Sequence, residues 1–123
     1  MSPNTKIVAQ IFIGSVWVFH GLYSKILNRI PRHRLIVGKI LGAAKARVAT
    51  QAIGFLEVLL GIWVFTGSHS VACAVVQTAA IVSMNTLEIS LARELLLSAF
   101  GMVMLNLGFL ALIWNWALFS PKP

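Results

Sequence analysis

Four long apolar stretches set the strongest limit on how this chain can fold. The stretches cover residues 7–27, 48–66, 70–88 and 95–119. Each of them approaches the ~20 residues with which a helix crosses a bilayer. Only 11% of the 123 residues are charged and 59% are hydrophobic, so a soluble domain of this length could not bury its apolar surface. Because the alternating pattern of a β-barrel strand is missing, we predict one all-α domain over residues 1–123, an integral membrane four-helix bundle.

Basic residues are concentrated between the first two stretches. Seven of the ten Lys and Arg residues fall there, with no acidic residue among them. They are Lys25, Arg29, Arg32, Arg34, Lys39, Lys45 and Arg47. Since cytoplasmic loops of membrane proteins carry an excess of Lys and Arg, this connection is predicted to be cytoplasmic. Four crossings then place both termini on the outer side.

The same basic segment predicts an amphipathic helix over residues 31–46 that lies on the membrane surface. Pro31 suits the first turn of a helix, and Ile36 and Ile40 share one face while most basic side chains lie elsewhere. The basic residues alternate with aliphatic residues and not with aromatic rings that could stack on bases. We therefore expect a bilayer with anionic headgroups as the partner of this segment, and no nucleic acid.

Glu57 is a lone carboxylate inside the second apolar stretch. An ionised carboxylate in hydrocarbon costs roughly 2.5–3.5 kcal/mol on insertion scales, so such residues usually face the interior of a bundle. Gly54 and Gly61 share its helical face and allow close approach of a neighbouring helix. Two interpretations stay open: a protonated carboxyl group that donates to Asn106 or Gln77, and a carboxylate that carries a proton or binds a ligand.

The other polar residues of the spans fall into two layers. Gln77 and Asn106 share the mid-depth of Glu57, and the cytoplasmic layer holds a larger polar cluster together with His20 and Lys25. The cytoplasmic-side cluster consists of Asn85, Glu88, Arg93 and Glu94. For the amides the alternative to a ligand site is hydrogen bonding between helices. For Glu88, Arg93 and Glu94 the alternative is an ion-pair network that fixes the turn before the last span.

Several reaction classes are excluded or disfavoured by the residues that the sequence contains. The single Cys73 cannot form a disulfide within the chain or a pair of redox-active thiols. His20 and His69 are expected at opposite membrane faces, so we predict no metal site. There is no Asp and no nucleophile–base or phosphate-binding motif. We assign no catalytic residue, and an independent enzymatic activity is left uncertain and disfavoured.

Three segments resemble the signatures of the DoxX-like family of small four-helix bacterial membrane proteins. The first is WVFHGLYSKIL at residues 17–27, the second is GFLEVLLG at residues 54–61, and the third joins Gly101 to Asn106. The resemblance implies the four-helix fold and a multi-pass location in the bacterial cytoplasmic (inner) membrane. It also implies that Lys25, Glu57 and Asn106 are candidate functional residues. Some relatives are subunits of quinone-reducing thiosulfate or terminal oxidases. Others are fused to cytoplasmic nucleotide-binding domains, which implies the opposite orientation of the first span.

The resemblance favours an accessory membrane subunit that binds a quinone-like or other lipophilic molecule for a partner oxidoreductase. Under this hypothesis Glu57 exchanges a proton, His20 relays it toward the cytoplasm and Asn106 orients the ligand. Lys25 and Gln77 complete the candidate ligand and proton site. The alternatives are a small proton-coupled transporter or exporter and a structural or assembly protein without a ligand. Small residues on several spans leave a homodimer open.

Overall fold

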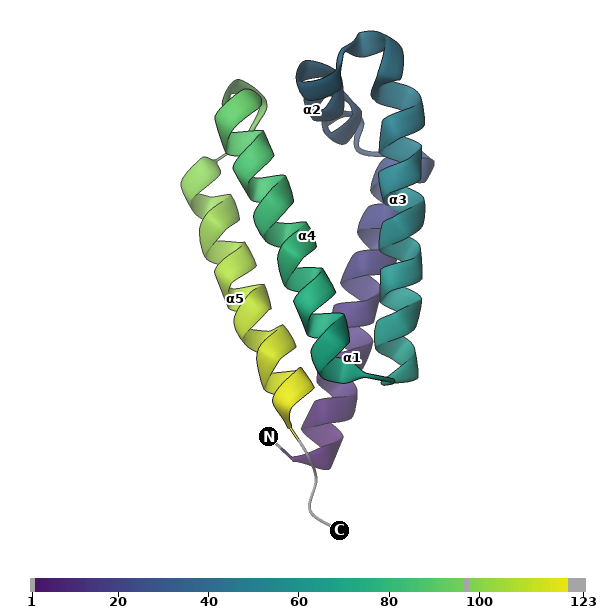
Figure 1. Ribbon diagram of the computed structural model, residues 1–123, viewed down its shortest axis with the longest axis vertical. Helices are drawn as coiled ribbons and strands as arrows, with labels where there is room; N and C mark the ends of the chain where they lie inside the picture. The colour runs from purple at the N-terminus through teal and green to yellow at the C-terminus, as the bar shows by residue number, and fades with distance from the viewer. Residues whose placement is uncertain (1, 97, 120–123) are drawn as a thin grey trace.

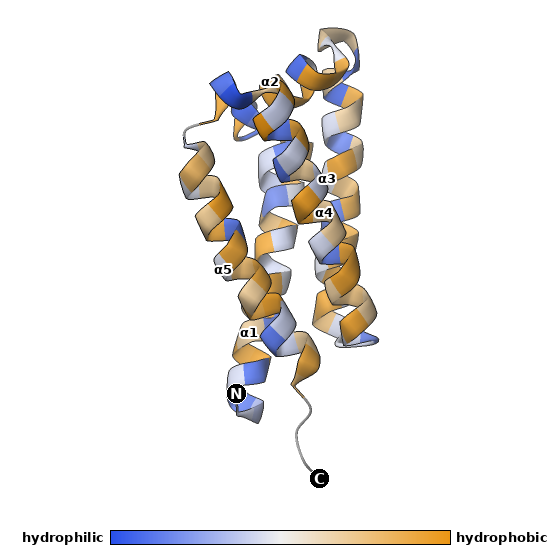
Figure 2. Ribbon diagram, turned by 60° about the vertical axis from the view of Figure 1, so that its left-hand side comes forward, coloured by the Kyte–Doolittle hydropathy of each residue, from blue (hydrophilic) through white to orange (hydrophobic). Residues whose placement is uncertain are grey.

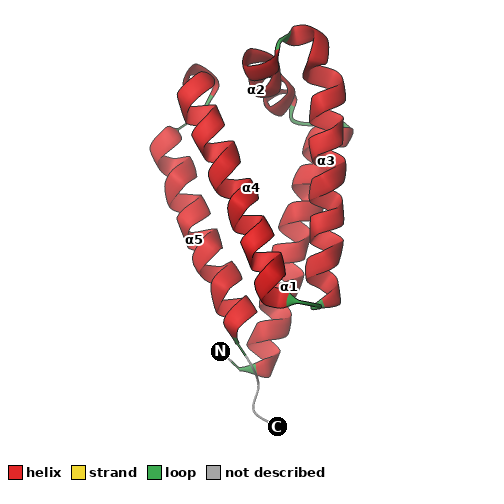
Figure 3. Cartoon of the chain, in the orientation of Figure 1, coloured by secondary structure: helices red, strands yellow, loops and turns green. Residues whose placement is uncertain are grey.

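The computed structural model describes residues 2–96 and 98–119, and these residues contain helices and no strand. Four long helical segments run roughly along the long axis of the molecule, and one short helix lies at the end opposite to the first and last described residues (Figure 1). Short connections join the helices (Figure 3). In chain order the elements are α1 (Pro3–Val18), η1 (Phe19–Ile26), α2 (Pro31–Leu41), α3 (Ala43–Thr66), α4 (Ser70–Leu91), η2 (Arg93–Leu95) and α5 (Ala99–Leu118).

Four of these helical segments are long and apolar enough to cross a membrane. They are Pro3–Ile26, Ala43–Thr66, Ser70–Leu91 and Ala99–Leu118. Large apolar side chains cover their outer surfaces, among them Phe100 at 76% exposure and Leu105 at 77%. Blue, hydrophilic residues are frequent at α2 and the adjoining helix ends, whereas the rods are largely orange (Figure 2). The fold is therefore the expected all-α membrane bundle, with a basic helix between its first two spans.

Several predicted boundaries differ from the structure by about three to five residues, and two of these differences have a local cause. The basic helix ends at Leu41 and not at residue 46, because Gly42 adopts φ +96° and breaks the helical path. The last span begins at Ala99 and not at residue 95. A 3₁₀ turn, η2, precedes it, and the Ser98 hydroxyl accepts a hydrogen bond from the Gly101 N–H at 3.0 Å, which caps the new helix.

Glycines bring the backbone of the first span against that of α3. A Cβ atom on Gly54 would lie 2.6 Å from the carbonyl oxygen of Gly21, and one on Gly61 would lie 2.8 Å from that of Gly14. Gly14 and Gly21 are seven residues apart on the first span, and Gly54 and Gly61 are seven apart on α3. The two contacts therefore form one seam along the two helices. The predicted close approach at Gly54 and Gly61 is thus confirmed, and it aims Glu57 at the first span.

The first span changes its helical period near its C-terminal end. Residues 19–26 form a π-helix, η1, whose pattern ends with the Leu27 N–H donating to the Leu22 carbonyl at 2.9 Å. Such turns are rare and often occur at functional sites. In an α-helix residues five apart point ~140° away from each other. A π turn brings them toward one face, and here it brings His20 and Lys25 toward the same side.

The packed core lies toward the end of the bundle that carries the termini. Its largest fully buried apolar side chains are Ile13, Val64, Ile113 and Trp116. Toward α2 the pair α4–α5 diverges from the pair α1–α3, as Figure 1 shows. The residues between the two pairs at that end do not close into a second apolar core, and they line a cavity instead.

Candidate functional site

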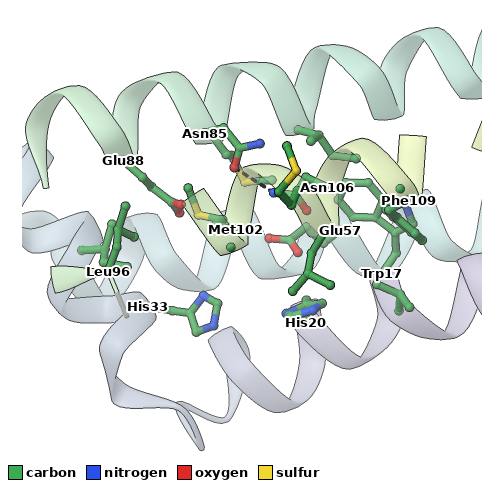
Figure 4. Close-up of a pocket in the computed structure, with 18 of the residues that line it drawn as sticks. Trp17, His20, His33, Glu57, Asn85, Glu88, Leu96, Met102, Asn106 and Phe109 are labelled. Atoms are coloured by element: carbon green, nitrogen blue, oxygen red, sulfur yellow. Dashed lines mark hydrogen bonds between the residues drawn. The ribbon is translucent and has the colours of Figure 1, made fainter. Parts of the chain in front are cut away.

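A cavity of about 840 Å³ lies between the two helix pairs and beneath α2. All five α-helices and η1 contribute to its wall, and the close-up in Figure 4 shows the side chains that point into it. Most of the wall is apolar and includes Trp17, Ile81, Met84, Met102 and Phe109. The polar lining residues are His20, Lys25, Arg32, His33, Glu57, Asn85, Glu88, Ser98 and Asn106.

The cavity contains a buried ion pair. The Lys25 ammonium lies 2.7 Å from Glu57 Oε1, and the two side chains are 9% and 7% exposed. The Gly21–Gly54 contact brings the two helices close enough for this pair. The approach is so close that a Cβ atom on Gly54 would lie 2.9 Å from Lys25 Cβ. Of the two interpretations of Glu57, the one in which it donates to Asn106 or Gln77 does not match the structure, where these amides bond to Asn85 and Trp17. The partner of Glu57 is a lysine, which gives the carboxylate a neutralising charge inside the span.

Asn106 joins the last two spans at the cavity wall. Its Nδ2 donates a 2.9 Å hydrogen bond to Asn85 Oδ1, drawn as the dashed line in Figure 4. The expected hydrogen bond between helices is thus present, although its partner comes from the cytoplasmic-side cluster. Asn85 keeps its NH₂ group and Asn106 its carbonyl oxygen for further bonds. The amide pair can therefore both donate to and accept from a ligand.

Gln77 is fully buried and is not among the residues that line the cavity. Its Oε1 accepts a 2.7 Å hydrogen bond from the indole N–H of Trp17, and its Nε2 lies 3.5 Å from Cys73 Sγ. Trp17 does line the cavity, and its ring centroid is 6.3 Å from that of Phe109. Gln77 thus lies behind the cavity surface and holds the Trp17 ring, which forms part of the wall.

Two histidines meet in the part of the cavity next to α2. His20 comes from η1 and His33 from α2, and their ring centroids are 6.0 Å apart. Burial, followed by the nearby positive charge of Lys25, lowers the pKa of His33 to about 4. At neutral pH the His33 ring is therefore uncharged, with one N–H donor and one nitrogen acceptor. His20, a predicted site residue, thus lies next to a ring from α2.

The predicted cytoplasmic-side cluster divides into two parts. Asn85 and Glu88 line the cavity, whereas Arg93 and Glu94 are exposed on η2. The ion-pair network expected among Glu88, Arg93 and Glu94 is wrong: Glu94 pairs with Lys39 of α2 at 3.0 Å. The pKa of Glu94 is lowered by a hydrogen bond from its own backbone and by Lys39. This exposed pair links α2 to the turn between α4 and α5.

Sequence reasoning missed most of the cavity wall. His33, Arg32, Trp17, Met102 and Phe109 were not predicted as site residues. For several lining residues a usable signal existed, because residues three, four or seven apart on a helix share a face. Lining residues do follow this spacing, as in Trp17 and His20, Ile81 with Met84, Asn85 and Glu88, and Met102 with Asn106 and Phe109. Within residues 2–96 and 98–119, no group of three His, Cys, Asp or Glu side chains is placed to hold a metal ion.

A comparison with known protein families matches the part of the chain that carries the site residues. The profile of the DoxX-like family matches residues 14–114 of the 123, a range that includes Lys25, Glu57 and Asn106. No curated protein and no solved structure shows a significant match to the chain. Because the match covers most of the chain and the four apolar helices agree with it, this small multi-pass membrane protein belongs to the DoxX-like family.

Proposed function

We propose that this protein binds a quinone-like lipophilic molecule in the cavity between its helix pairs and serves a partner oxidoreductase as an accessory subunit of the bacterial cytoplasmic membrane. The cavity carries the proposal. Its volume of about 840 Å³ and its apolar wall with a few convergent polar groups are typical of small-molecule sites. A water-soluble substrate would gain little binding free energy from contact with such an apolar wall. A lipophilic molecule already dissolved in the bilayer has the apolar surface that fits it.

The polar side chains assign roles within this proposal. Asn106 and Asn85 offer amide donors and acceptors that orient a carbonyl-bearing ring. Glu57 takes up or returns a proton, and the adjacent Lys25 charge stabilises the carboxylate that remains. His20 and His33 lie next to each other on the side of α2, so they form the start of a proton path to the cytoplasmic face. A bound quinone would supply two-electron chemistry, which no side chain here supplies.

The basic end of the protein supports the orientation and the lipid partner. Exposed basic residues gather on α2, on the connection before it and at the start of α3; they include Arg29, Lys39, Lys45 and Arg47. In our proposal these side chains lie at the cytoplasmic surface against anionic headgroups, which attract juxtamembrane basic segments. The start of α1 and the end of α5 lie at the other end of the bundle (Figure 1), which our proposal assigns to the outer side.

Proton-coupled transport of a small solute is the second candidate. The observation that favours it is the ion pair of Lys25 and Glu57 inside membrane spans, because ionisable residues at such depth often mark ion or proton pathways. Uptake of a labelled solute into proteoliposomes under an imposed proton gradient distinguishes the two functions. Quinone retention without uptake supports the subunit, and uptake that needs Glu57 supports the transporter.

The test of the proposed function is quinone retention by the purified protein. Native mass spectrometry and lipid extraction would compare wild type with Glu57→Gln and Asn106→Leu. Each variant has a matched control outside the cavity: Glu94→Gln in the exposed ion pair, and Asn115→Leu on the surface of the same helix α5. Circular dichroism and gel filtration would verify folding of all five proteins.

We expect wild type and both controls to retain a quinone, and both cavity variants to lose it. A well-folded wild type that retains no quinone, even after incubation with an added one, would refute the proposal. Equal retention by wild type, Glu57→Gln and Asn106→Leu would refute the assigned site.

A further inference from the structure

The exposed residues of the cavity wall show where the cavity opens. Among the lining residues, those that are themselves exposed all belong to α1 or to α5 with its capping residue. They are Phe12, Ser98, Met104, Leu105 and Gly108. Phe12 and Phe109 contact edge to face at 6.3 Å and form the lower rim. The opening thus lies between the first and the last span.

Most of this opening lies at the mid-depth of the spans, and only Ser98, which caps the start of α5, lies toward their end. Gly108 is close to the middle of α5 (Ala99–Leu118), and Phe12 is close to the middle of the span Pro3–Ile26. At the inner end α2 covers the cavity with Ile36, which is only 5% exposed. The Lys39–Glu94 ion pair holds α2 against the turn between α4 and α5. A ligand that enters at the rim therefore comes from lipid and not from the cytoplasm.

Gly108 keeps the rim clear. Glycine is an unfavourable residue in a helix, so its presence mid-helix usually reflects close packing against a neighbour. Here no such neighbour exists among the described residues, because a Cβ atom on Gly108 would meet no heavy atom within 4 Å. The position is open space at the cavity wall. A large side chain could be placed there without a clash and would obstruct the opening.

The charges that face the cavity balance one another. Lys25 and Arg32 are positive, Glu57 and Glu88 are negative, and Lys25 already lies 2.7 Å from Glu57. A ligand with a charged head would place an unpaired charge among them, which is costly in a site of low polarity. An uncharged head loses little and can bond to the amides of Asn85 and Asn106.

We propose that an amphiphile with an uncharged, hydrogen-bonding head enters the cavity sideways from the lipid, between Phe12 of α1 and the Leu105–Gly108 face of α5. Its head lies beside the amide pair and the Lys25–Glu57 ion pair, and its tail leaves along Trp17 and Phe109. This inference rests on the proposed use of the cavity as a ligand site. It does not require the ligand to be a quinone.

The experiment measures binding to the full-length protein in lipid nanodiscs. The probes have tails of matched length and differ in their heads: decylubiquinone and monodecanoylglycerol are uncharged, decanoate is anionic and decylamine is cationic. The variant Gly108→Phe fills the opening. The matched control is Ala111→Phe, which adds a ring to an exposed position on the same helix outside the cavity wall. Native mass spectrometry counts bound probes and protein chains.

We expect wild type and Ala111→Phe to bind at least one uncharged probe, and both charged probes to bind at least about tenfold more weakly. Gly108→Phe should weaken binding of the uncharged probe by about tenfold or more, because its ring occupies the entrance. Binding of monodecanoylglycerol without decylubiquinone would support this inference while it counts against the proposed quinone function.

Four results would overturn the inference. The first is unchanged binding by Gly108→Phe, which would place the entrance elsewhere. The second is equally tight binding of a charged probe, which would refute selection of an uncharged head. The third is a wild-type dimer that Gly108→Phe converts to a monomer, because the α5 face would then hold a second copy of the chain. A wild type that binds none of the probes also refutes it.

Discussion

Removal of either partner of the Lys25–Glu57 pair should destabilise the protein strongly. The side chains are 9% and 7% exposed, so a lone charge left behind is largely cut off from solvent. Breaking a buried pair by removing one partner costs ~3–5 kcal/mol in proteins. We therefore expect Lys25→Met and Glu57→Met each to lower the free energy of unfolding by an amount in this range.

The double variant separates the pair from the packing around it. Replacement of both members of a buried pair by apolar residues of similar volume is often neutral or stabilising. Lys25→Met/Glu57→Met should therefore recover most of the loss seen in the single variants. The Lys39–Glu94 pair is an internal control of the same chemistry, with side chains 54% and 57% exposed. Its single and double methionine variants should unfold like wild type, because solvent screens exposed pairs.

The assay is unfolding in detergent micelles followed by far-ultraviolet circular dichroism, analysed as two double-mutant cycles. The reasoning requires a large favourable coupling between Lys25 and Glu57 and none of note between Lys39 and Glu94. Single variants at Lys25 and Glu57 that each cost less than about 1 kcal/mol, as exposed pairs do, would refute it. So would a double variant as unstable as the sum of the two single ones.

Three further perturbations test other contacts. Gly54→Ala should lower the free energy of unfolding by ~1–3 kcal/mol, since its Cβ would lie 2.6 Å from the Gly21 oxygen. Gly108→Ala, in open space, should raise it by ~0.5–1 kcal/mol. Equal effects of the two variants in thermal unfolding would contradict the glycine seam. Gln77→Leu leaves the Trp17 indole N–H without its acceptor, so we expect a loss of ~1–3 kcal/mol and a shifted Trp emission spectrum that a Trp17→Phe background lacks. The folded-state pKa of His33 is lowered from 6.5 to about 4, so between these pH values the unfolded chain binds a proton that the folded chain does not. Stability should therefore be constant above pH 6.5 with respect to this group and fall as the pH drops toward about 4; His33→Gln should flatten that part of the profile, and an unchanged slope would contradict the assignment.

Hydropathy was sufficient to predict the fold. A span needs about twenty apolar residues whatever its neighbours are, so the four helices follow from local composition alone. The ends of the helices depend on single residues. Gly42 with its positive φ and the capping hydroxyl of Ser98 moved two boundaries by several residues. Such local events are weakly expressed in hydropathy, which averages over a window.

The site was only partly predictable, for a different reason. Gly54 and Gly61 indicated which face of α3 is buried, and so they indicated that Glu57 points inward. Its partner depends on how α3 is aligned along the first span, and that alignment is set by the contact of Gly21 with Gly54. Four glycines in the first two spans allow more than one alignment. Lys25 was therefore a candidate by resemblance but could not be assigned to Glu57.

The period of the first span is the feature that the sequence concealed most. Taken as a regular α-helix, Gly21 faces α3, Lys25 lies one turn later on nearly the same face, and His20 points ~140° away from Lys25. The π-helix η1 reduces that angle, so the ammonium that pairs with Glu57 and the imidazole beside His33 enter one cavity. Of the four residues in between, Leu22 and Tyr23 are 45% exposed and face outward, whereas Gly21 and Ser24 are buried. The ion pair and the histidine pair thus share one cavity because of the hydrogen-bond pattern of a single helical segment. The sequence of that segment is equally compatible with a regular α-helix.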